Sequence, residues 1–269
     1  MNETLIVTLF VIFAIIYFSI LGGVIYLSYR YIKYINDLKL KLLEYKEHTV
    51  FLRITRITEE YENGLRQSIN LINRLNKKGH QVILLVVGSI YSETLYENLI
   101  QTGNSKIVFV TEDKYTKNSK EILDIADFVI GTGRSLMEAA SKRKVLLTPV
   151  KLRKYPSIVN EKTFFNFFTT NFSERNSPFY SDDENFKIIE ELINKSNTYT
   201  ENTTWSYSKY TKYFNLENVV EKYLTLYNDI YRDTCKTHHI LKNSLDFIFH
   251  FIKVHKNIIT HFKYKYKNL

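Results

Sequence analysis

The sequence predicts an α/β fold, a Rossmann-like doubly wound parallel sheet, with an N-terminal transmembrane helix before it. Segments rich in β-branched residues alternate with segments of helical periodicity between residues 49 and 150, joined by short loops. The run Gln81–Gly88 is continuously apolar after its first residue, which is typical of a strand buried on both faces of a parallel sheet. A Gly-Thr-Gly-Arg turn, Gly131–Arg134, joins another apolar run to a helix.

The sheet domain is expected to consist of strands and helices in regular alternation. Alternating β-branched residues mark the strands, whereas apolar residues at three- and four-residue spacing mark the helices. In chain order we expect a strand at Val50–Ile54, a helix at Leu65–Lys77, a strand at Gln81–Gly88, a helix at Tyr91–Gln101, a strand at Lys106–Thr111, a helix at Lys117–Asp127, a strand at Phe128–Ile130, a helix from Ser135 or Leu136, and a strand at Val145–Thr148.

The pattern is weaker after Pro149. Here we expect a basic loop at Lys151–Asn160, an aromatic segment at Thr163–Phe168 that suits either a short strand or a patch beside a ligand or membrane, a helix at Asp182–Asn194, a polar loop at Thr198–Thr204, and a helix at Asn215–Arg232 that Asn215 caps.

The N-terminal run Leu5–Leu27 is apolar and uncharged, and at about 1.5 Å per residue it is long enough for a hydrocarbon core of ~30 Å. A cleaved signal peptide would have basic residues before the run and a small-residue cleavage site after it, and the sequence has neither. Arg30 and Lys33 follow the run, so the positive-inside rule predicts a single-pass membrane protein with its N-terminus outside and its body in the cytoplasm.

Four regions follow from these patterns. We expect a transmembrane signal anchor at 1–30, an amphipathic stalk at 31–48, the sheet domain at 49–232 and a basic amphipathic tail at 233–269. The tail suits an anionic membrane surface, and the alternative is a packing helix with one solvated face.

Composition narrows the function classes. The formal net charge of +9 is compatible with nucleic acid, an anionic membrane or phosphorylated ligands, and because no nucleic-acid motif accompanies it we expect no nucleic-acid partner. The single cysteine, Cys235, excludes an intrachain disulfide and a cysteine-based zinc site. The histidines of the tail lack metal-site spacing, and we expect neither a metal nor a cofactor.

The turn Gly131–Arg134 is the candidate ligand site. A glycine turn between a strand and a helix can present backbone N–H groups to a phosphate, and Arg134 can add a bidentate charge. Glu138, one helical turn further, is suited to ribose hydroxyls. The alternative is an ordinary strand-to-helix turn, with Arg134 solvated and Glu138 a charge on the helix surface.

The surrounding segment Ala126–Ala140 resembles the donor-binding segment of GT-B glycosyltransferases of the retaining, glycogen-synthase-like (group 1) type. In that family an Ala-Asp-hydrophobic segment leads through a loop into a Glu-Ala-x-Ala helix, and a strand ending in proline follows. The resemblance extends over roughly Thr49–Tyr227, the size of the C-terminal, donor-binding half of such an enzyme. It implies binding of a UDP- or GDP-linked nucleotide sugar.

The resemblance also implies which residues meet the donor. Arg56 matches a family arginine at the diphosphate, although it also suits a surface charge at a strand end. The family's following lysine falls among Tyr61, Glu62 and Asn63, and Arg66, one helical turn away, is a substitute. The donor-binding residues implied are Arg56, Gly88, Gly131, Thr132, Gly133, Arg134 and Glu138.

Two departures separate this chain from the family. Ile130 stands where the retaining enzymes have an acidic residue eight positions before Glu138, so binding is implied more strongly than turnover. The acceptor-binding half is also missing. We therefore expect a membrane-anchored glycosyltransferase-like protein at the cytoplasmic face, acting in glycan or lipid-linked sugar assembly with a partner chain that supplies the acceptor half. The alternative is a non-catalytic interaction protein, or an inactive, truncated glycosyltransferase remnant.

Overall fold

The computed structural model describes residues 17–26, 28–29, 32–33, 36–37, 45, 47–117, 119–194 and 197–234. The chain divides into two compact units, of which the first ends at Lys212 and the second begins at Tyr213. Most of the expected anchor and stalk, and the tail from 235 onward, lie outside the described residues, so these boundaries stay predictions. Among the described residues, no helix combines the length and the apolar character that crossing a membrane requires.

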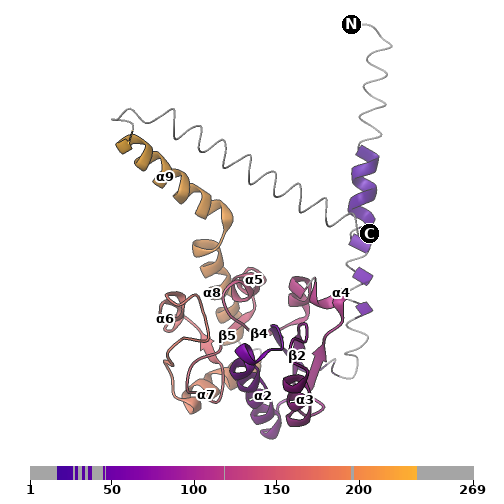
Figure 1. Ribbon diagram of the computed structural model, residues 1–269. Helices are drawn as coiled ribbons and strands as arrows, with labels where there is room; N and C mark the ends of the chain where they lie inside the picture. The colour runs from indigo at the N-terminus through magenta and orange to yellow at the C-terminus, as the bar shows by residue number, and fades with distance from the viewer. Residues whose placement is uncertain are drawn as a thin grey trace. The chain divides into compact units, whose positions relative to one another are not determined.

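The first unit contains a Rossmann-like sheet, which confirms the predicted α/β class (Figure 1). Within the described residues the strand order is β3-β2-β1-β4-β5-β6; β1 to β5 are parallel, and β6 pairs antiparallel with β5. The strands are β1 (Thr49–Ile54), β2 (Val82–Val87), β3 (Ile107–Val110), β4 (Phe128–Ile130), β5 (Val145–Thr148) and β6 (Ser157–Val159).

Helices connect and cover these strands. They are α2 (Glu62–Lys77), α3 (Glu93–Thr102), α4 (Asp113–Thr116), α5 (Arg134–Ser141), α6 (Phe164–Phe168), α7 (Asp182–Ile193) and α8 (Asn197–Tyr213), with 3-10 turns η2 (Glu59–Tyr61) and η3 (Ser119–Ile125). The second unit contains α9 (Leu216–Thr234), which confirms the helix expected at Asn215–Arg232. The N–H of Glu217 donates to Asn215 Oδ1 at 3.4 Å, as expected of a capping residue.

The core explains the continuous apolar run. Every residue of β2 is buried, and Val82, Leu84 and Val86 pack in one cluster with apolar residues of α2, α3 and α7. The alternate residues of β2 point to the opposite face of the sheet, since successive side chains of a strand alternate. Burial of each such side chain contributes about 2 kcal/mol. β2 is therefore buried on both faces, as predicted.

Two expectations about the region after Pro149 and the helix before β4 were wrong, and one was wrong in part. The basic loop contains β6, a strand of three residues held by pairing with β5. The aromatic segment forms the helix α6 rather than a strand, because Phe164 and Phe167, three positions apart, are both buried. Its alternative role, as a patch beside a ligand or membrane, stays a prediction. The helix expected at Lys117–Asp127 is the 3-10 segment η3.

The polar loop expected at Thr198–Thr204 is also wrong, because this stretch lies inside the helix α8. The hydroxyl groups that suggested a loop are satisfied by the helix itself. Thr203 Oγ1 donates to the carbonyl of Thr200 at 3.0 Å, and Ser206 Oγ lies 2.9 Å from the carbonyl of Thr203. Ser206 Oγ also lies 3.0 Å from the carbonyl of Lys144, which joins α8 to the start of β5.

Candidate functional site

The site lies where the direction of winding in the sheet reverses. From β1 the chain winds through β2 to β3 in one direction, whereas β4, on the other side of β1, leads to β5 in the opposite direction. Ligands of open α/β sheets bind at the carboxyl ends of the strands at such a switch point. Arg56 follows β1 and Gly131–Arg134 follows β4, so the fold places both candidate groups at this edge.

Three N–H groups of the glycine turn are hydrogen-bonded within the protein. The N–H of Gly131 donates to the carbonyl of Leu147 at 2.9 Å, and the N–H of Thr132 donates to Ser135 Oγ at 3.2 Å. Gly133, at φ 47°, donates its N–H to the carbonyl of Asn171 at 3.1 Å. These three N–H groups therefore donate to acceptors within the protein. Within the described part of the chain, no hydrogen bond engages the N–H of Arg134, the first residue of α5.

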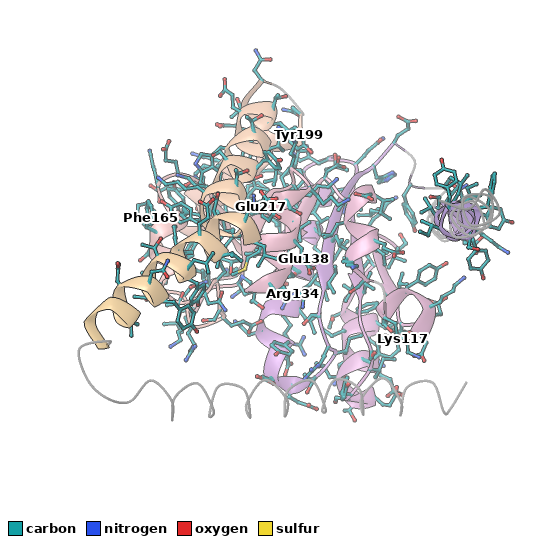
Figure 2. The ribbon with its side chains drawn as sticks, turned by 90° about the horizontal axis from the view of Figure 1, so that it is seen from above. Lys117, Arg134, Glu138, Phe165, Tyr199 and Glu217 are labelled. Carbon is teal, nitrogen blue, oxygen red and sulfur yellow. The ribbon has the colours of Figure 1, made fainter. Side chains whose placement is uncertain are left out.

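Arg134 and Glu138 form an ion pair along α5, one helical turn apart (Figure 2). Arg134 Nε donates to Glu138 Oε1 at 2.8 Å, and the Arg134 side chain is 86% exposed against 32% for Glu138. Glu138 also lines a cavity of about 390 Å³ between η3 and α5, together with Lys120 and Lys142. This volume is within the range of small-molecule pockets. The exposed Arg134 side chain is thus paired with a partly buried carboxylate that lines a pocket.

The remaining candidate residues are exposed, paired on their own helix, or explained by packing. Arg56 is exposed, and its guanidinium lies 5.7 Å from the ring centroid of Tyr91. Arg66 pairs with Glu62 on α2, Nε to Oε1 at 2.7 Å. Gly88 is explained by packing, because a side chain there would overlap the carbonyl of Thr55.

Sequence analysis missed a buried ion pair at the same edge. Arg53, in β1, is 2% exposed, and its Nη2 lies 3.1 Å from Oε1 of Glu174. Arg53 Nε and Nη1 are buried and have no hydrogen-bond partner among the residues that the structure describes. Burial lowers the pKa of the Arg53 guanidinium below its ordinary value, and Glu174 opposes that shift. An arginine inside the apolar run of β1 was the available signal, since buried arginines are rare unless paired.

Glu174 belongs to the segment Asn171–Asn176, which contacts residues at the ends of β1, β4 and β5. We call it the crossing segment. Its Asn171 carbonyl accepts the N–H of Gly133 after β4, and its Phe172 carbonyl accepts Thr148 Oγ1 of β5 at 3.0 Å. Glu174 reaches Arg53 of β1. The crossing segment is therefore held over the switch point by its own backbone and one carboxylate.

Comparison with known proteins gives structural likenesses only. No protein-family model and no curated protein sequence matches this chain. Solved structures that resemble it include the C-terminal domain of a glycosyl transferase group 1 family protein, LpcC, from Francisella tularensis. That domain is 18% identical, with a TM-score of 0.44, over 64% of this chain and 90% of that one.

Two larger proteins of S. aureus also resemble the chain. A TarM mutant in complex with fondaparinux, alpha-GlcNAc-glycerol and UDP is 14% identical, with a TM-score of 0.48, over 67% of this chain and 36% of TarM. MnaA with UDP is 13% identical, with a TM-score of 0.41, over 69% of this chain and 48% of MnaA. The chain thus spans less than half of either protein. These neighbours are of the GT-B type that the sequence resemblance indicated. The function proposed below rests on this chain's own residues.

Proposed function

We propose that the sheet domain binds a UDP- or GDP-linked nucleotide sugar at the switch-point edge, as a glycosyltransferase-like donor domain. The observation that carries the proposal is the pairing of Arg134 with Glu138 at the start of α5, beside a cavity of about 390 Å³. Arg134 supplies charge and paired N–H donors for a diphosphate, together with its own backbone N–H. Glu138 supplies a carboxylate that accepts hydrogen bonds from ribose hydroxyls.

In this proposal the anion binds to the Arg134 side chain rather than to the N–H groups of the glycine turn. Three of the turn's N–H groups are bonded within the protein, so they offer nothing further to a phosphate. The Arg134 guanidinium is exposed and held only by a surface ion pair, which is worth about 0–1 kcal/mol. A diphosphate can therefore draw Arg134 from Glu138 at small cost, and this frees Glu138 for the ribose.

The setting of this binding is also part of the proposal. The uncharged run Leu5–Leu27 anchors the chain in a membrane with the sheet domain on the cytoplasmic face. The bound sugar serves glycan or lipid-linked sugar assembly, and a partner chain supplies the acceptor half. A second candidate is a non-catalytic interaction protein. It is favoured by Ile130, which is fully buried and apolar at the position of the family's acidic residue.

Calorimetry on the full chain in detergent tests the proposal with a panel of UDP- and GDP-sugars. We expect one of them to bind with a Kd near the micromolar range, about −8 kcal/mol. Arg134→Ala and Glu138→Gln should each weaken binding at least tenfold. Lys117→Ala is the matched control, because Lys117 forms a similar exposed pair with Asp113 on α4 at 2.8 Å. Absence of binding by a folded chain, or equal loss in the control, would contradict the proposal.

A further inference from the structure

We propose that Arg53 anchors a phosphoryl-binding subsite beneath the crossing segment, and that Glu174 occupies this subsite when no ligand is bound. The inference rests on the proposed function, since it concerns the same edge of the sheet. It adds Arg53, which was not among the predicted site residues. It also adds Glu174, a side chain of the same protein that competes with the ligand. The ligand class is an anion with phosphoryl oxygens, such as the diphosphate of a nucleotide sugar or free pyrophosphate.

The first support is unused hydrogen-bonding capacity. A guanidinium has five N–H donors in a planar fork, and Arg53 uses Nη2 for Glu174. Its Nε and Nη1 are buried, and no described residue accepts a hydrogen bond from them. Buried donors without acceptors are costly, so natural structures rarely keep them. Carboxylates and phosphoryl groups can both accept two parallel N–H bonds from an arginine fork, but the contact between Arg53 and Glu174 joins Nη2 to one carboxylate oxygen.

The second support is the position of the pair at the start of a long helix. Gly64 is the third residue of α2, and a side chain there would overlap both Arg53 Nη2 and Glu174 Oε1. The absence of a side chain at Gly64 thus lets the Arg53 guanidinium and the Glu174 carboxylate lie against the first turn of a helix of 16 residues. Helix N-termini favour negative charge through their dipole. The place that the Glu174 carboxylate occupies is therefore close to both Arg53 and the first turn of α2.

The third support is access. Arg53 is 2% exposed but the Glu174 side chain is 19% exposed, so the carboxylate forms the solvent-facing side of the pair. Glu174 also lies on the crossing segment rather than on a strand or helix, so it can leave without breaking a secondary-structure element. An incoming phosphoryl group takes the place of the Glu174 carboxylate, and the carboxylate moves to water. No covalent bond changes in this exchange.

Glu174→Gln tests the exchange, because it removes the competing charge while keeping the size of the side chain. The probe is inorganic pyrophosphate, titrated by calorimetry into the full chain. We expect at least tenfold tighter binding in Glu174→Gln than in the unmodified chain, and loss of that gain in Arg53→Met/Glu174→Gln. The control is Glu191→Gln, which removes one negative charge from an exposed position on α7.

Equal pyrophosphate affinity in the unmodified chain and Glu174→Gln, with unchanged circular dichroism, would overturn the subsite. An equal gain in Glu191→Gln would also overturn it, as a general charge effect. If Glu174→Gln does not fold, Glu174→Asp replaces it, since the shorter carboxylate competes less well and should raise affinity several-fold. No change in Glu174→Asp overturns the subsite as well.

A parallel titration with UDP-glucose separates this inference from the proposed function. In one outcome UDP-glucose binding depends on Arg134, but Glu174→Gln does not change the affinity for pyrophosphate. This outcome supports the donor domain and overturns the subsite. A gain for pyrophosphate that depends on Arg53, without binding of any nucleotide sugar, supports the subsite and contradicts the donor domain.

Discussion

The carbonyl oxygen of Asn171 accepts the N–H of Gly133 at 3.1 Å, so the crossing segment is fixed to the turn that precedes α5. Both residues have positive φ, 54° for Asn171 and 47° for Gly133. The contact occupies a backbone N–H that a strand–glycine–helix motif would otherwise present to a ligand. The turn therefore joins two parts of the candidate site, and in our proposal the ligand is bound by the side chains around it.

Replacing Asn171 by alanine should destabilise the chain by about 1 kcal/mol, because alanine is disfavoured at left-handed φ whereas asparagine tolerates it. Asn171→Gly is the matched control, since glycine adopts this conformation without steric cost and keeps the same backbone contact. Urea unfolding of both variants measures the difference. If the two variants have equal stability, the backbone conformation at 171 is not the cause of any loss.

Gly88→Ala should reduce the free energy of unfolding by about 3 kcal/mol or prevent folding, as overpacking does. The added methyl group would overlap the Thr55 carbonyl, which is backbone and cannot rotate away. Gly103→Ala is the control, because its new methyl group would lie 3.1 Å from the Leu99 carbonyl and needs only a small shift. Thermal unfolding of both variants checks this. A normal melting temperature for Gly88→Ala would show that β1 and β2 can separate at this end.

The sequence identified elements whose signal is local. β2 was predicted because burial on both faces leaves every one of its residues apolar. α9 was predicted because its N-cap, Asn215, and its helical periodicity lie within one stretch. The same logic placed Gly131–Arg134 between a strand and a helix, and correctly put Arg134 and Glu138 one turn apart.

Elements that depend on distant partners were missed. α8 is rich in threonine and serine, and its hydroxyl groups are satisfied by helix carbonyls and by Lys144, contacts that composition does not reveal. β6 has three residues and exists through its pairing with β5. The ion pair of Arg53 with Glu174 joins residues 121 positions apart, so no local pattern could connect them. For the same reason the sequence could not predict that the crossing segment accepts the N–H of Gly133.

Arg53→Met should destabilise the chain by about 1–3 kcal/mol, because Glu174 loses its hydrogen-bond partner and its carboxylate must turn to water. Arg53→Met/Glu174→Gln should recover part of that loss, since the second change removes the unpaired charge. A double-mutant cycle in urea gives the coupling energy of the pair. If the double variant is as unstable as the sum of the two single variants, the ion pair contributes no coupling.

Acid should weaken the contact between α2 and α7 through Glu190. The hydrogen bond with His80, Nε2 to Oε1 at 2.9 Å, lowers the pKa of the Glu190 carboxyl below its ordinary 4.5; partial burial opposes this, and Lys78 adds to it. Because the folded-state pKa is lowered, the stabilisation is present above pH 4.5 and is lost as the pH falls through the folded-state pKa.

Glu190→Gln should therefore reduce stability at pH 7 and make the chain less sensitive to acid than the unmodified protein. Glu191→Gln, on the exposed neighbouring residue of α7, is the control for removing one negative charge. Urea unfolding at pH 7 and below pH 4 measures the difference between the variants. The expected result is a gap between Glu190→Gln and the unmodified chain that narrows in acid, because protonated Glu190 has already lost its ionic attraction to Lys78. A gap that stays constant with pH would mean that the Glu190 charge does not hold α7 against the end of α2.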